Sequence, residues 1–150
     1  MTAFCRISER PIRLREPVTT PNAIVVQDTT LLGGPDLFNG LADDGFVLIN
    51  TNRTVDTLGI GEAVARLPAG HIQCVAATEI ARKHLGRPLP NAALLGGLLA
   101  MTGIVSLDSL KKAILQKFSG EIGRKNGMAA EETFCNIKSL LEAGVAAVAR

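Results

Sequence analysis

The chain has 150 residues, of which 47% are hydrophobic and 20% charged, so it can form a hydrophobic core and is not intrinsically disordered. A net charge of +2, with five Phe and no Trp or Tyr, argues against a nucleic-acid partner. The length predicts one domain over residues 1–150. Three widely separated cysteines and no Cys-x-x-Cys pair predict reduced thiols in the cytoplasm, with no metal site.

Three short apolar runs predict buried strands. The first two are continuous rather than alternating, which is typical of strands covered on both faces. Roughly 20 residues separate successive runs, which is enough for a crossover connection and too long for a hairpin, so the strands should be parallel. The predicted strands are Ala23–Val26, Phe46–Ile49 and Ile72–Val75, with Ala3–Ser8 as a further strand near an edge.

The second half of the chain carries helix signals. Its longest apolar stretch, Ala92–Val105, is shorter than the ~20 residues needed to cross a bilayer, so it predicts a buried helix and no membrane partner. The expected caps are Thr78, Asn91 and Ser106, and a last helix should begin near Met128. These elements predict an α/β fold: a Rossmann-like three-layer domain with a mainly parallel sheet and a helical C-terminal half.

Polar side chains follow the first two predicted strands. Asp28 and Thr30 come after the first strand, and Asn50 and Thr51 after the second. Ligands of open parallel sheets bind beyond the carboxyl ends of the strands, so these four residues are candidates for a binding site. The alternative, favoured for Asp28 and Asn50, is that they satisfy backbone groups of the loops.

A second candidate is the arginine-rich stretch between residues 6 and 15. Pro11 and Pro17 restrict its backbone, and guanidinium groups form paired hydrogen bonds with carboxylates and phosphates. A solvated, salt-bridged surface is the slightly favoured interpretation. The alternatives are a docking surface for a partner subunit and a contact to an anionic ligand such as coenzyme A. The arginines are Arg6, Arg10, Arg13 and Arg15.

No complete catalytic constellation is visible. The sequence contains no G-x-S-x-G, H-E-x-x-H, P-loop or G-x-G-x-x-G motif. His71 and His84 lack the spacing of metal ligands, and structural or solvent-exposed roles are expected for both. We therefore expect no catalytic residues in this chain.

The order of several segments resembles a known family, the gamma subunit (or gamma domain) of 2-oxoacid:acceptor oxidoreductases, which includes pyruvate and ketoisovalerate ferredoxin oxidoreductases. The series covers almost the whole chain in the order and spacing of the family. The matching segments are MTAFCRISERPIRLR (1–15), AIVVQDTTLL (23–32), GFVLINT (45–51), ATEIARKHLGRPLPNAALLG (77–96) and GIVSLDSLKKAI (103–114).

The resemblance implies a function that the motifs alone do not. Members oxidatively decarboxylate a 2-oxoacid to an acyl-CoA, with thiamine diphosphate and Mg²⁺ held between alpha and beta subunits. Iron–sulfur clusters in partner subunits pass electrons to ferredoxin or another acceptor. The expected partners are therefore alpha, beta and delta-type subunits, and this chain alone should bind no cofactor. Near coenzyme A or the subunit interface we expect Arg13, Arg15, Asp28, Thr30, Asn50 and Thr51.

The sequence also departs from the family pattern. Gamma subunits normally begin with a Gly-rich turn, a helix and a further strand, and Met1 stands after that region. We expect a naturally short version, a fragment, or a missing part supplied by another chain. Thr29 replaces the usual Pro of an Asp-Pro-Thr-Leu-Leu motif. The alternative functions are a free-standing Rossmann-like protein that binds a nucleotide or acyl-CoA, and an inactive fragment.

Overall fold

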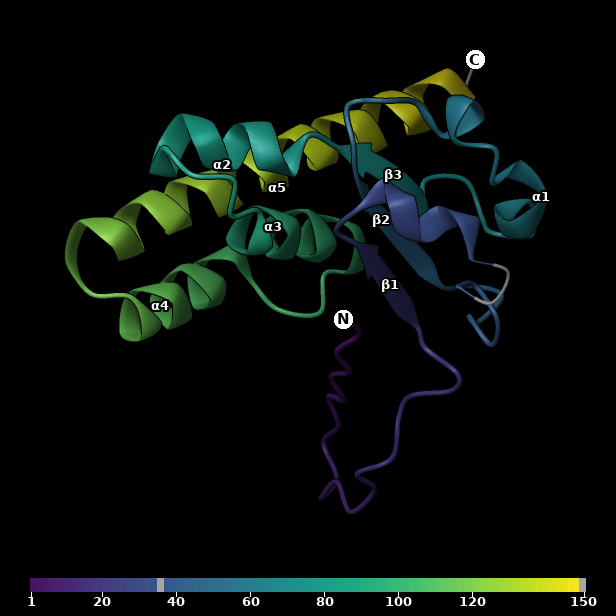
Figure 1. The fold of residues 1–150 in the computed structure, drawn as a ribbon, viewed down its shortest axis with the longest axis horizontal. Coiled ribbons are helices and arrows are strands. Elements are labelled where there is room, and N and C mark those ends of the chain that lie inside the picture. Colours follow the sequence, from purple (N-terminus) through teal and green to yellow (C-terminus); the bar gives the residue numbers. More distant parts are fainter. Residues whose placement is uncertain (35–36, 149–150) are drawn as a thin grey trace.

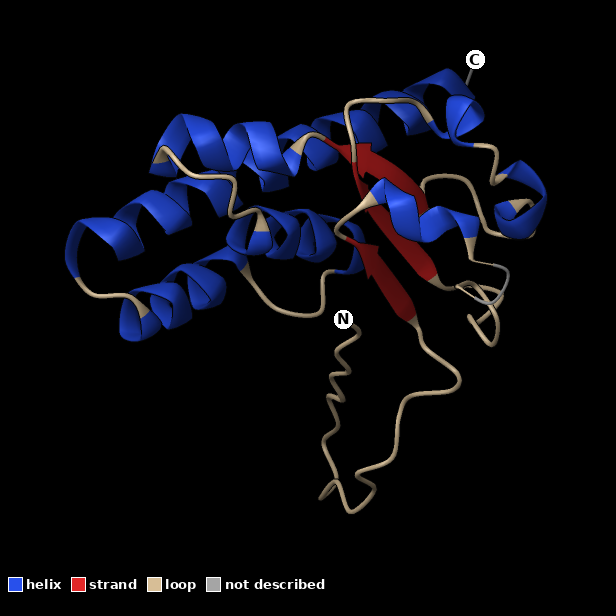
Figure 2. Cartoon of the chain, in the orientation of Figure 1, coloured by secondary structure: helices blue, strands red, loops and turns tan. Residues whose placement is uncertain are grey.

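A computed structural model describes residues 1–34 and 37–148 (Figure 1). Figure 2 shows a sheet, coloured red, flanked by helices, and a long N-terminal loop. The strands are β1 (Ala23–Val26), β2 (Phe46–Asn50) and β3 (Ile72–Val75), and the short helices are η1 (Thr29–Gly33), η2 (Val55–Leu58) and α1 (Gly61–Val64). The longer helices are α2 (Ala77–Leu85), α3 (Asn91–Thr102), α4 (Leu107–Lys117) and α5 (Gly120–Val148).

The strands form one sheet in the order β1-β2-β3, and both pairings are parallel. Ala23 lies opposite Phe46, and Val47 lies opposite Ile72. The three predicted strands and their parallel direction are thus confirmed. Strand β2 is central, and its Val47, Leu48 and Ile49 are fully buried because both faces of the sheet are covered.

Two layers of helices cover the sheet. Leu48 belongs to a core cluster with residues of α2, α3 and α5, whereas Val47 and Ile49 belong to a cluster on the opposite face with residues of η2 and α1. Figure 1 shows the long helices gathered on one side of the sheet and α1 on the other. The predicted three-layer α/β fold with a helical C-terminal half is confirmed.

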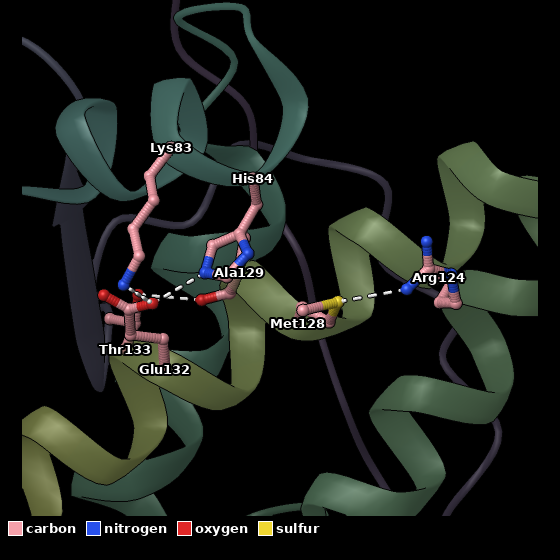
Figure 3. Close-up of polar contacts among 7 residues, drawn as sticks. All are labelled: Lys83, His84, Arg124, Met128, Ala129, Glu132 and Thr133. Carbon is pink, nitrogen blue, oxygen red and sulfur yellow. Dashed lines mark hydrogen bonds and ion pairs between the residues drawn. The ribbon is translucent and has the colours of Figure 1, made fainter.

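Helices α3 and α5 pack closely because α3 carries two glycines. A Cβ atom on Gly96 would lie 2.0 Å from the carbonyl oxygen of Ala130, and one on Gly97 would lie 3.0 Å from a methyl of Leu48. Thr133, fully buried in α5, donates its hydroxyl to the carbonyl of Ala129 (Figure 3). The small residues of α3 therefore set how closely α5 approaches the sheet.

Of the last two helices, one begins where predicted and the other does not. Helix α4 begins after Ser106, as expected, and this cap accepts from the N–H of Ser109 at 3.1 Å. Helix α5, however, begins at Gly120 rather than near Met128. The additional turns are stabilised by Glu121, whose carboxylate pairs with Lys125 at 3.1 Å. Asn126 adds a hydrogen bond to the carbonyl of Ile122.

The predicted strand at Ala3–Ser8 is wrong, because no strand or helix occurs in residues 1–22. This N-terminal segment runs out from the body and returns to β1 (Figure 1). Within this segment, the side chain of Arg6 donates to the carbonyls of Glu16 and Pro17, at 3.0 and 3.2 Å, and so holds its outgoing and returning parts together. Its apolar side chains have no core to enter and remain exposed, as in Ile7 at 67%.

Both histidines have structural roles, as predicted. His71 stacks on Phe46, with ring centroids 4.2 Å apart, and its Nδ1 lies 3.0 Å from the carbonyl oxygen of Asp44. His84, at the end of α2, places its Nε2 2.6 Å from the carboxylate of Glu132 on α5, and Lys83 bonds the same oxygen at 2.8 Å (Figure 3). These contacts join α2 to α5.

The contacts of Lys83 and His84 on α2 with Glu132 on α5 should make the stability of the protein depend on pH. The hydrogen bond from Lys83, followed by that from His84, lowers the pKa of Glu132. A lowered carboxyl pKa contributes stability that is present above the unfolded-state pKa and is lost as pH falls through the folded-state pKa. We expect Glu132→Gln to cost about 1 kcal/mol at pH 7 and progressively less below about pH 4.

Urea unfolding at pH 7 and at pH 3.5 measures this difference directly. Glu142→Gln is the control, because Glu142 lies exposed on the same helix and makes no ion pair among the residues described. It should change the free energy of unfolding by less than about 0.5 kcal/mol. An equal cost of Glu132→Gln at both pH values would contradict the assignment of the effect to the ionised carboxylate.

Candidate functional site

The carboxyl ends of the parallel strands meet at one edge of the sheet, where Asp28, Thr30 and Thr51 follow their strands and Asn50 is the last residue of β2. Asp28 is the N-cap of η1. Its Oδ1 accepts from the backbone N–H of Thr30 at 2.9 Å and from the Thr30 hydroxyl at 2.8 Å. Both bonds lower the pKa of the Asp28 carboxyl, and the bond from the backbone N–H of Thr30 has the larger effect. Asp28 and Thr30 therefore hold the turn after β1.

Asn50 joins three elements at this edge. Its Nδ2 donates to the carbonyl of Gln27 at 3.0 Å, just beyond β1, and to the hydroxyl of Thr78 at 2.8 Å. Its Oδ1 accepts from the N–H of Thr78 at 3.1 Å, in the first turn of α2. One amide side chain thus ties the end of β1 to the end of β2 and supplies the missing cap of α2.

The remaining polar groups of the edge also bond to one another. Gln27 donates to Oδ1 of Asn91 at the start of α3, at 3.2 Å. Asn52 donates to the carboxylate of Glu79 on α2 at 3.3 Å. The hydroxyl of Thr51 accepts from the N–H of the residue two places further on, at 3.1 Å. The edge is therefore a hydrogen-bonded network that positions α2 and α3 against the sheet.

These contacts correct two predicted caps. Thr78 is not the N-cap of α2, because the helix already includes Ala77 and Asn50 satisfies the N–H of Thr78. Asn91 is the first residue of α3 rather than its cap, and its side chain accepts from Gln27 instead. Gln27, Asn52, Thr78, Glu79 and Asn91 belong to the network but were not predicted as members of a site. Gln27 and Asn52 could have been found from their positions just after the strands, whereas the sequence carries no such signal for Thr78, Glu79 and Asn91.

Replacing Asn50 with Ala should destabilise the protein by about 2 kcal/mol, because the half-buried hydroxyl and N–H of Thr78 and the exposed carbonyl of Gln27 all lose their partner. Asn52→Ala is the matched control, since it removes one exposed hydrogen bond of 3.3 Å at the same edge. It should cost less than about 0.5 kcal/mol. Chemical unfolding of both variants measures these costs, and equal effects would show that Asn50 has no special role.

Arg13 and Arg15 do not join the network at the strand ends. Both are exposed in the N-terminal segment, which projects from the body (Figure 1). Within the described part of the chain, neither guanidinium makes an ion pair or hydrogen bond. Residues 1–22 contain four Arg and two Glu, so the other 12 basic and 12 acidic residues of the chain balance. The formal net charge of +2 thus lies entirely in this segment.

The cysteines lie in separate parts of the fold. Cys5 is in the N-terminal segment, Cys74 in β3 and Cys135 in α5, and all three are free thiols. Burial raises the pKa of the Cys74 thiol. Over the described ranges, no three His, Cys, Asp or Glu side chains gather closely enough to hold a metal ion. The described residues therefore do not supply the ligands of an iron–sulfur cluster or of a Mg²⁺–diphosphate site.

The fold and the strand-end network define an α/β domain with a parallel sheet, and comparison with known proteins gives its family. Residues 1–135 match the pyruvate ferredoxin/flavodoxin oxidoreductase family model. The chain belongs to this family. The described helices include none that is long and apolar enough to cross a membrane.

Named relatives agree with the predicted gamma-type resemblance. The chain is 41% identical over 134 residues to the pyruvate/ketoisovalerate oxidoreductases common subunit gamma of Thermococcus kodakarensis, covering 89% of this chain and 71% of that one. It is 40% identical to the pyruvate synthase subunit PorC of Methanothermobacter marburgensis, covering 91% and 71%. The crystal structure of the pyruvate oxidoreductase subunit PORC from Thermotoga maritima matches with a TM-score of 0.67 and 33% identity. That match covers 78% of this chain and 64% of the Thermotoga chain, so the chain spans about two thirds of its relatives.

Proposed function

We propose that the chain is the gamma-type subunit of a multi-subunit 2-oxoacid:acceptor oxidoreductase. The observation that carries this proposal is the 39–41% identity to gamma subunits over 89% of the chain. The complex would oxidatively decarboxylate a 2-oxoacid such as pyruvate to an acyl-CoA. Thiamine diphosphate, Mg²⁺ and iron–sulfur clusters would be held by alpha, beta and delta-type subunits, and electrons would pass to ferredoxin or another acceptor.

The strand-end network supports a structural role rather than a catalytic one. Asp28, Thr30, Asn50 and Thr51 all use their polar atoms to hold turns and helix starts. A free-standing protein that binds a nucleotide or an acyl-CoA would need donors directed at its ligand. This arrangement favours a subunit that completes the enzyme without supplying reacting groups.

The exposed arginines support a contact with a partner. Arg13 and Arg15 have no carboxylate partner within the described chain, and their segment carries the whole formal net charge. At least one of them should pair with a carboxylate of a partner subunit or with a phosphate of coenzyme A. A buried pair of this kind loses several kcal/mol when one side is truncated, whereas an exposed pair contributes at most ~1 kcal/mol.

Reconstitution tests the subunit assignment. The isolated chain should give no pyruvate-dependent, coenzyme A-dependent reduction of a viologen dye. The remaining subunits should gain activity when this chain is added. Turnover by the chain alone, or a complex whose purified form lacks this chain, would contradict the proposal.

The arginine contact is tested by changing Arg13 and Arg15 to Ala together. We expect subunit association, or the apparent affinity for coenzyme A, to weaken at least about tenfold in low salt. The control removes two exposed cations from the body of the protein, through Arg82→Ala with Lys117→Ala, and should leave both quantities unchanged. Unchanged association and affinity in the Arg13/Arg15 variant would leave the segment as an ordinary solvated surface.

A further inference from the structure

Strand β1 has an open edge. In the parallel pairing of β1 and β2, the N–H of Phe46 donates to the carbonyl of Asn22 at 2.9 Å. This bond determines which residues of β1 direct their backbone N–H and C=O groups toward β2. Alternate residues of a strand direct their backbone groups to opposite sides, so Ile24 and Val26 bond to β2 while Ala23 and Val25 direct theirs outward. Among the described residues, nothing pairs with these outward groups of Ala23 and Val25.

A trench of about 750 Å³ runs along this open edge. All four residues of β1 line it, and so do residues 1–4 of the N-terminal segment. Figure 1 shows the N-terminus near β1, with the N-terminal segment leading away from it. Further apolar lining comes from Leu31 of η1, from Leu37 in a turn, and from Leu94 and Leu95 of α3.

The chemistry of the trench selects its occupant. None of the side chains that the structure describes around it is ionisable, so a charged ligand would find no charged side chain there among the described residues. The outward N–H and C=O groups of Ala23 and Val25 can be satisfied by the backbone of another strand. Because apolar side chains line the trench both from α3 and from η1 and the turn that holds Leu37, that strand should carry apolar side chains on both of its faces.

We propose that the trench receives an extended, apolar β-strand from a polypeptide other than a second copy of this chain, and that this strand pairs with β1 as the next strand of the sheet. The proposal explains why Val25 and Leu31 are exposed, at 36% and 48%, beside the open edge. It also explains why residues 1–4 stand apart from β1 and do not pair with it: the added strand would lie between them. The inference depends on the geometry of the edge and is independent of the proposed enzymatic function.

Natural strands for the test are available from a relative. The match covers 71% of the Thermococcus kodakarensis gamma subunit, which leaves 29% of that protein outside it. Overlapping 12-residue peptides from this remainder, each fused to a soluble carrier, serve as probes for the full chain. Amide hydrogen exchange is read at single residues by NMR.

The isolated chain should show slow exchange at Ile24 and Val26 and fast exchange at Val25, because only the first two bond to β2. At least one carrier-fused peptide should bind and slow the exchange of the Val25 amide at least about tenfold. Slow exchange at Val25 in the isolated chain, as a monomer or as a dimer of this chain, would overturn the proposal. Failure of every peptide to bind would do the same.

Substitutions then separate strand pairing from other docking. Val25→Pro removes the outward N–H while leaving the bonds to β2, and should weaken peptide binding at least about tenfold, whereas Val25→Ala should not. Leu31→Glu places a carboxylate on the trench wall and should also weaken binding at least about tenfold. Its control, Leu140→Glu, changes a leucine of similar exposure that lies away from the trench. Binding that is insensitive to both Val25→Pro and Leu31→Glu, in folded variants, would show that the peptide docks elsewhere.

Discussion

Changing Gly96 to Ala should destabilise the protein by about 3 kcal/mol, through an overlap between α3 and α5. The added Cβ would lie 2.0 Å from the carbonyl oxygen of Ala130, 2.7 Å from its carbonyl carbon and 2.8 Å from its Cα. These are backbone atoms, so no rotamer change relieves the overlap and the two helices must separate. Separation opens the core around Ala93 and Ala129, both fully buried.

Thermal and urea unfolding of Gly96→Ala measure the cost. Gly144→Ala is a matched control on α5, because a Cβ there meets nothing within 4 Å and the residue has no positive φ. Alanine is the better helix former by about 1 kcal/mol, so the control should be neutral or slightly stabilising. If Gly96→Ala is as stable as Gly144→Ala, the close approach of α3 and α5 is wrong.

The strands were predictable because their residues carry the signal themselves. The run from Phe46 to Ile49 is continuously apolar, and the structure buries Val47, Leu48 and Ile49 on both faces of the sheet. The start of α5 was not predictable in the same way. Gly120, Gly123 and Gly127 read as helix breakers, whereas Gly123 is needed because a Cβ there would lie 1.9 Å from the carbonyl oxygen of Phe118. This requirement comes from the close approach of α5 to the residue that ends α4, which helix propensities do not take into account.

The candidate site, too, could be predicted from the sequence only in part. The position of Asn50 after an apolar run predicted that it would lie at the sheet edge, and the structure places it as the last residue of β2, opposite Val75. Its partner Thr78 lies 28 residues further along the chain, so no local capping rule could assign the N–H of Thr78 to Asn50. The wrong strand at Ala3–Ser8 has a related cause, since a strand forms only where a neighbour offers an edge at pairing distance.

The second large effect is expected at Leu48, in the central strand. Leu48 is fully buried and packs with Val75, Ile80 and Ile137 in the core between the sheet and the long helices. Leu48→Ala removes three carbon atoms and leaves a cavity that close-packed backbone on both sides cannot fill, so a loss of about 3 kcal/mol is expected. Leu140→Ala, at a site 52% exposed, should change stability by less than about 0.5 kcal/mol.

A double-mutant cycle with Gly97 tests whether this loss arises from the cavity. A Cβ on Gly97 would lie 3.0 Å from a methyl of Leu48 and 3.1 Å from the Cγ2 of Thr133, so Gly97→Ala alone should overpack the core and destabilise it. In the Leu48→Ala background the first of these contacts is absent, and the new methyl enters the space that Leu48 leaves. The double variant should therefore be more stable than the sum of the single changes predicts, by at least about 0.5 kcal/mol in unfolding free energy. Strict additivity would mean that Leu48 and Gly97 do not share this space, and the packing of α3 on β2 would have to differ from the structure.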